Sequence, residues 1–96
     1  MTLIEIKEYL KVDGNDDDKL IEMLQLEAEE YLTGAGIAKD YTKNRYKLAV
    51  LLLVSDGYEN RQIRSDKSVN VIDRVNRIIL QLQLEVGVIN ESRKTN

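Results

Sequence analysis

The stretch RYKLAVLLLVSDGYENR, residues 45–61, decides the fold of this 96-residue chain. After a start that is rich in cations, it contains six consecutive apolar residues, Ala49 to Val54. A helix that is apolar on every side for more than one turn needs cover on every side. We therefore predict an all-α fold, a small bundle of about four helices around a central apolar helix at approximately 40–61.

Two further helices are predicted before this segment. Thr2 and Glu5 form a Thr-x-x-Glu capping box, which predicts a first helix that ends near Val12. A run of aspartates at 16–18 suits the positive N-terminal end of a second helix, because carboxylates cap free N–H groups and complement the helix dipole. The glycine-rich turn at 34–36 predicts the end of that helix.

A fourth helix is predicted from about residue 69 to residue 86. Ile72, Val75, Ile79, Leu82 and Val86 repeat at alternating steps of three and four residues, which is a heptad-like apolar seam. Residues 1–89 are therefore expected to form a single helical domain. The polar residues 90–96 are expected to be a disordered C-terminal tail.

The composition argues against several kinds of chemistry. The chain has no cysteine and no histidine, so it lacks thiolates, disulfides and the usual general base at neutral pH. Its longest apolar run falls far short of the ~20 residues of a membrane span, and no secretory signal is visible. We expect no enzyme, no cofactor and no membrane partner, and a chain that is soluble and intracellular or is part of an assembly built inside a cell.

The aspartate-rich segment 13–18 resembles the start of a calcium loop. However, Asp18 stands where such a loop needs glycine, and Leu24 stands where it needs a bidentate glutamate. The segment is better interpreted as a turn followed by a helix cap, and no metal site is predicted.

Charge is distributed unevenly along the chain. Residues 1–36 carry a net charge of −7, whereas residues 37–96 carry +4. Such runs are usually solvated helix faces, but the acidic half can also meet the basic half of a neighbouring copy. On this second interpretation, the candidate subunit interface comprises the acidic Asp17, Glu22, Glu29 and Glu30, the basic Arg45, Lys47, Arg61 and Arg64, and the surplus apolar Leu80 and Leu84.

An alternative function is a small helix-turn-helix regulator that binds DNA. Lys39, Lys43, Arg45 and Lys47 crowd the start of the third helix, with Asn44 available for a base edge. The strongly acidic preceding helix argues against this alternative, because it would repel the phosphate backbone.

Several motifs, in a fixed order over roughly residues 1–62, carry a resemblance to a known family. Lys7, Tyr9, Leu10 and Val12 precede the aspartate-rich turn, and a helix follows with Leu20, Ile21, Ala28, Tyr31 and Leu32 at inner positions. The third helix has the run Ala49–Val54 and ends in Tyr58-Glu59-Asn60-Arg61. This order resembles the small head–tail connector (adaptor) proteins of tailed bacteriophages and prophages. The chain departs from the family at Asp56-Gly57, where a His or a bulky residue is frequent, and in the following loop, which lacks proline.

The resemblance implies a non-enzymatic structural protein of the virion. Such proteins assemble in the bacterial host cytoplasm and form a homo-oligomeric ring beneath the portal protein at the head–tail interface. They contribute to head completion and receive a downstream head-completion or tail protein. DNA is expected only as passing cargo, without sequence-specific binding.

Overall fold

The computed structural model describes residues 1–60 and 67–95, with side chains for residues 1–59 and 71–85. It contains the helices α1 (Leu3–Leu10), α2 (Asp18–Gly34), α3 (Asn44–Asn60) and α4 (Lys67–Thr95). These described parts of the chain contain no strand, so the predicted all-α fold is confirmed.

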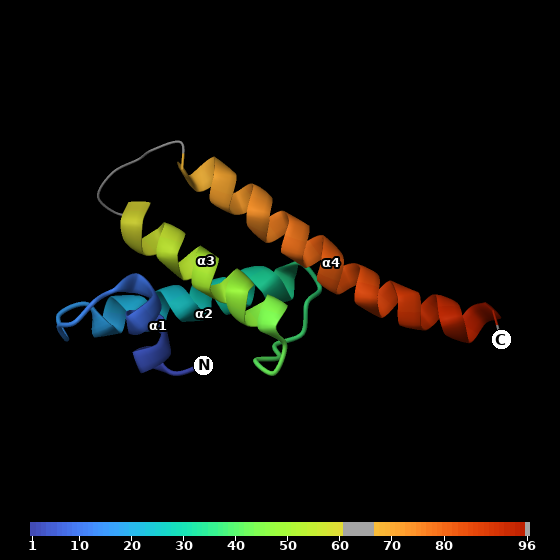
Figure 1. The fold of residues 1–96 in the computed structure, drawn as a ribbon, viewed down its shortest axis with the longest axis horizontal. Coiled ribbons are helices and arrows are strands. Elements are labelled where there is room, and N and C mark those ends of the chain that lie inside the picture. The colour runs from blue at the N-terminus through green and yellow to red at the C-terminus, as the bar shows by residue number, and fades with distance from the viewer. Residues whose placement is uncertain (61–66, 96) are drawn as a thin grey trace.

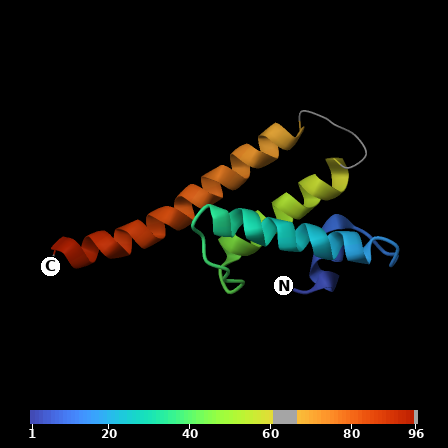
Figure 2. The same ribbon diagram turned by 180° about the vertical axis from the view of Figure 1, so that it is seen from behind.

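Helix α3 contacts each of the other three helices. Figure 1 shows α1 and α2 on one side of α3 and α4 on the other side. The C-terminal part of α4 extends away from the other helices in this view and in the view from behind (Figure 2), which makes the molecule elongated, at 54 × 28 × 19 Å.

The core is almost entirely aliphatic and draws on all four helices and on the segment between α2 and α3. Its buried side chains are Ile6, Ile21, Ala28, Leu32, Ile37, Tyr46, Ala49, Val50, Leu52, Val54, Val75, Ile78, Ile79 and Leu82. The apolar run of α3 supplies four of these residues but is not enclosed within the chain, because the preceding Leu48 is 38% exposed and Leu51 and Leu53 are only partly buried.

The start of α1 and the end of α2 follow from local hydrogen bonding, as predicted. The predicted aspartate cap at the start of α2 is wrong, because Asp17 stands at the N-cap position without a side-chain cap hydrogen bond. The N–H of Glu5 donates to Thr2 Oγ1 at 3.2 Å, and the N–H of Thr2 donates to Glu5 Oε1 at 3.0 Å, which completes the capping box. At the end of α2, Gly36 adopts a φ of +84°, and the N–H of Ile37 donates to the carbonyl of Leu32 at 2.9 Å. This is a Schellman ending, and it buries Ile37 beside Leu32 in the core.

Helix α3 begins later than the sequence predicts. The carboxylate of Asp40 accepts hydrogen bonds from the N–H and the hydroxyl of Thr42, and the N–H of Lys43 donates to the Asp40 carbonyl at 3.2 Å. A side chain that accepts a hydrogen bond from the backbone N–H two residues further on competes with helix formation. Residues 40–43 therefore form a turn, and the helix starts at Asn44.

Helix α4 is longer than the sequence predicts. The expected end was near Val86, but the helix continues to Thr95. The expected disorder of residues 90–96 in isolation stays a prediction. No proline interrupts this part of the chain, and each residue that is added to an existing helix gains one backbone hydrogen bond.

Gly57 lies at a close approach between α3 and α2. A Cβ atom at this position would stand 2.7 Å from Leu24 Cδ2, well inside the 3.5–4.0 Å that is optimal between carbon atoms. The glycine inside the helix is therefore explained by helix packing.

Candidate functional site

The four acidic residues predicted for the interface do not share one surface. Glu22 and Glu30 are exposed on α2, as expected of an acidic outer face. Asp17 and Glu29 instead bind partners within their own chain. Only Glu22 and Glu30, of these four, keep an outward carboxylate for an intermolecular contact.

Glu29 lies in a polar cluster that ties α2 to the segment before α3. Its carboxylate accepts hydrogen bonds from the Tyr41 hydroxyl and from Gln25 Nε2, the latter at 3.4 Å, and Lys39 Nζ lies 3.5 Å away. Burial, and after it the hydrogen bond to the Glu29 carboxylate, raises the pKa of Tyr41 above its ordinary value. The cluster therefore links α2 to the segment before α3, two parts of the chain that the Schellman turn brings together.

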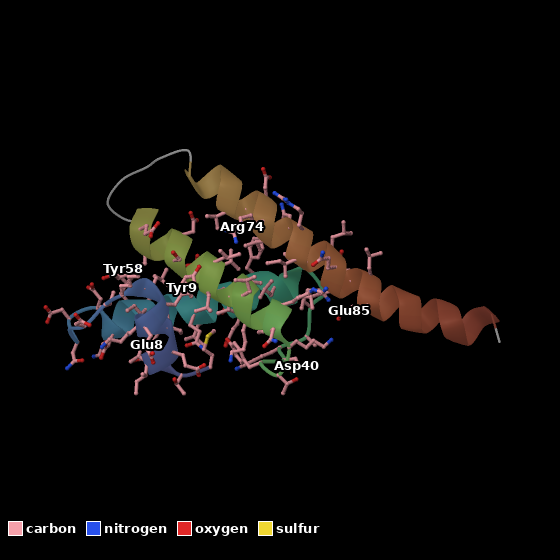
Figure 3. The ribbon with its side chains drawn as sticks, viewed as in Figure 1. Glu8, Tyr9, Asp40, Tyr58, Arg74 and Glu85 are labelled. Atoms are coloured by element: carbon pink, nitrogen blue, oxygen red, sulfur yellow. The ribbon has the colours of Figure 1, made fainter. Side chains whose placement is uncertain are left out.

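Asp17 binds the first residue of the Tyr58–Arg61 motif. The hydroxyl of Tyr58 donates to Asp17 Oδ2 at 2.6 Å, and the Tyr58 ring packs against the edge of the core. Figure 3 places Tyr58 near the turn that precedes α2. The contact joins the end of α3 to the start of α2 across 41 residues of sequence.

The predicted basic cluster also has partners inside the chain. Arg45 forms an ion pair with Glu85, and Lys43 Nζ lies 3.7 Å from the same carboxylate. Lys47 Nζ lies 3.4 Å from Glu5 Oε2. Together with the Lys39–Glu29 pair, these contacts do not favour a DNA-binding surface, because each cation already faces a carboxylate. Two further interface candidates, Arg61 and Arg64, lie outside the described residues.

Leu80 and Leu84, predicted as surplus apolar side chains, are indeed exposed. Each is 54% exposed on α4. A second exposed pair, which was not predicted from the sequence, lies on α2 and consists of Met23 (67% exposed) and Leu26 (60% exposed). Their positions off the buried stripe of Ile21, Ala28 and Leu32 would have revealed this pair. Tyr31, predicted on the inner stripe, is 43% exposed.

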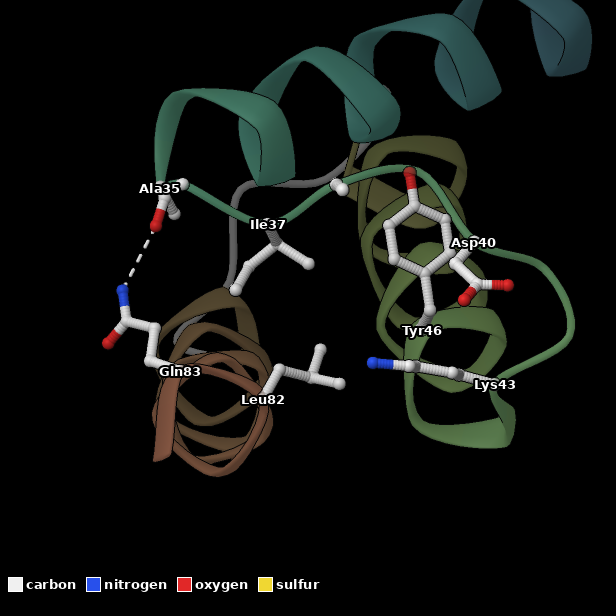
Figure 4. Close-up of a pocket in the computed structure, with 9 residues that line it drawn as sticks. Ala35, Ile37, Asp40, Lys43, Tyr46, Leu82 and Gln83 are labelled. Carbon is white, nitrogen blue, oxygen red and sulfur yellow. Dashed lines mark hydrogen bonds between the residues drawn. The ribbon is translucent and has the colours of Figure 1, made fainter. Parts of the chain in front are cut away.

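A hollow of about 330 Å³ lies between the α2–α3 segment, α3 and α4 (Figure 4). Ile37 and Leu82 form apolar walls, and Tyr46 points its hydroxyl end toward the segment that joins α2 to α3. This hydroxyl is buried and has no hydrogen-bond partner among the described residues. Gln83 Nε2 donates to the Ala35 carbonyl at 3.0 Å and so ties α4 to the end of α2.

The described side chains include no group of three or more acidic residues that would hold a metal ion. The aspartate-rich turn places Asp18 Oδ1 at 2.9 Å from Lys7 Nζ, and Lys7 also donates to Asn15. No helix in the described parts of the chain combines the length and the apolar character that a membrane span requires.

A family model described as "Phage gp6-like head-tail connector protein" matches residues 1–85. The chain belongs to this family. No curated protein and no solved structure matches the chain. Membership in the head–tail connector family assigns the chain to the structural proteins of a phage particle, with partners at the junction of head and tail. The match covers α1, α2, α3 and the described side chains of α4, including every exposed apolar side chain named above.

Proposed function

We propose that this connector protein assembles into a homo-oligomeric ring beneath the portal protein. In this position it completes the head, retains the packaged DNA and receives the next head-completion or tail protein. The observation that carries the proposal is the family match over residues 1–85. We further propose that the protein has no enzymatic activity and that it assembles in the host cytoplasm before it joins the virion.

Two features of the chain support an assembly role. Large apolar side chains are exposed in pairs on α2 and on α4, and the carboxylates of Glu22 and Glu30 point outward beside one of these pairs. Paired apolar side chains within a polar surface are typical of sites that contact another protein. An acidic subunit also suits a DNA conduit, because a channel lined with cations would bind the passing phosphates.

The proposal is tested by deleting the gene from an inducible prophage or a phage that carries it. We expect the deletion to give heads that package DNA but then lose it and fail to join tails. Supplying the gene in trans should restore infectivity. The purified protein should bind the portal protein of the same phage in a pull-down. A normal yield of infectious particles from the deletion would refute the proposed function.

The DNA-binding alternative is tested separately by a binding assay on the DNA that flanks the gene. We expect weak binding that falls steeply with added salt and shows no preference among sequences. A defined footprint that the Arg45→Ala variant abolishes would favour a regulator over a connector.

A further inference from the structure

We propose that the outer face of α2 on one copy packs antiparallel against the outer face of α4 on the next copy. The α2 outer face comprises Lys19, Met23, Leu26 and Glu30, and the α4 outer face comprises Asp73, Arg77, Leu80 and Leu84. In this arrangement Leu26 contacts Leu80, Met23 contacts Leu84, and Glu30 lies beside Arg77. The inference rests on the proposed ring and names the surfaces that hold it together.

Each outer face points directly away from the core of its own chain. All eight residues are exposed, and in each helix the four positions follow steps of four, three and four residues. With 3.6 residues per turn, this spacing forms one continuous stripe. On both helices the stripe lies opposite the buried residues, which are Ile21, Ala28 and Leu32 on α2 and Val75, Ile79 and Leu82 on α4.

Each stripe carries one cation and one anion, Lys19 and Glu30 on α2 and Asp73 and Arg77 on α4, and the two opposite charges that meet in the antiparallel register are Glu30 and Arg77. Besides Glu30, the outward side of α2 carries Glu22 and Glu27, whereas α4 carries Arg77 and Arg74. Neither Glu30 nor Arg77 has an ion pair within the described part of the chain. Both charges are therefore available to a second copy, unlike Glu29 and Arg45, which are paired internally.

Charge also selects the direction of packing. In the antiparallel register, Arg77 faces Glu30 and has Glu27 one turn away. In a parallel register that keeps the apolar pairs together, Arg77 would face Lys19 instead, and Glu30 would face no cation among the described side chains. Like charges at close range disfavour an arrangement, so the antiparallel register is the one that the sequence of charges supports.

A contact of this kind propagates from copy to copy. The two stripes belong to different helices, and α3 contacts both of these helices and lies between them (Figure 1). A contact between two different surfaces leaves one surface free at each end of the growing assembly. The assembly becomes a closed ring when the rotations between successive copies add up to a full turn. The apolar pairs supply most of the association, and the exposed charges set the register.

The natural chain has no cysteine, so engineered thiols report the contact directly. The Leu26→Cys and Leu80→Cys variants are mixed and oxidised at high protein concentration. We expect a covalent dimer in the mixture and little in either variant alone, because the same residue on two copies does not meet. Ile4→Cys is the matched control, because Ile4 is an exposed position on α1 (70% exposed). It is mixed with Leu26→Cys in one control and with Leu80→Cys in the other. Absence of Leu26–Leu80 product above the control level would overturn the proposed contact.

Charge reversal tests the register without cysteines. Glu30→Lys and Arg77→Glu should each weaken association by about tenfold in light scattering across protein concentration, as measured at low salt. Combining the two changes in one chain should restore most of the affinity. Two single variants that associate like the natural chain would refute the Glu30–Arg77 pair. The natural chain can bind the portal protein and form rings while neither the cysteine pair nor the charge reversals give the expected result. In that case the proposed interface is wrong and the proposed function stands. If the deletion phage is normal, the proposed function itself fails.

Discussion

The close contact between Gly57 and Leu24 gives a quantitative prediction. Replacing glycine by alanine inside a helix is ordinarily worth about 1 kcal/mol of stability. Here the new methyl group would meet Leu24 Cδ2 at 2.7 Å, so Leu24 must leave its rotamer, at a cost of about 0.5–1.5 kcal/mol. A groove of about 250 Å³ beside these residues gives Leu24 room to turn. We therefore expect Gly57→Ala to change the free energy of unfolding by less than about 1 kcal/mol.

The same change should become favourable once Leu24 is shortened. In a Leu24→Ala background the obstructing methyl is gone, so Gly57→Ala should recover its full gain of about 1 kcal/mol. Urea unfolding of the four proteins gives the coupling between the two sites, which we expect at about 0.5–1.5 kcal/mol. Gly34→Ala is the matched control, because no atom lies within 4 Å of its added Cβ. An equal effect of Gly57→Ala in both backgrounds would refute the packing explanation.

Three further predictions concern single side chains. Tyr46→Phe should leave the stability unchanged or raise the free energy of unfolding by about 1 kcal/mol, since the buried hydroxyl has no partner among the described side chains. A loss of more than about 1 kcal/mol in urea unfolding would contradict this. Tyr41→Phe should cost about 1 kcal/mol, since it removes the hydrogen bond to Glu29. Because the pKa of Tyr41 is raised, the folded protein keeps a hydroxyl proton that the unfolded protein releases near pH 10. Stability should therefore fall as pH rises above about 10, and this fall should be shallower in Tyr41→Phe. Thr2→Ala should cost about 1 kcal/mol by removing the helix cap, measured as a drop in the urea midpoint.

The sequence by itself determined the features that depend on neighbouring residues. The Thr2 capping box and the left-handed Gly36 were predictable because their hydrogen bonds span only a few residues. The exposure of Leu80 and Leu84 was also predictable, because the side-chain period of a helix places them opposite the buried seam. These three features rest on local geometry that the chain carries whatever it packs against.

The tertiary structure alone decided which charges are free. In sequence, Asp17 just before α2 and Glu29 within it look like the other acids of this region. Tyr58 and Tyr41, however, bind them from 41 and 12 residues away. Arg45 and Lys47 likewise find carboxylates about 40 residues distant. Partners at such separations are set by how the helices pack, and a charge count along the sequence holds no information about that packing. The segregated charge of the chain was therefore visible in advance, whereas the few charges left for a neighbouring copy were not.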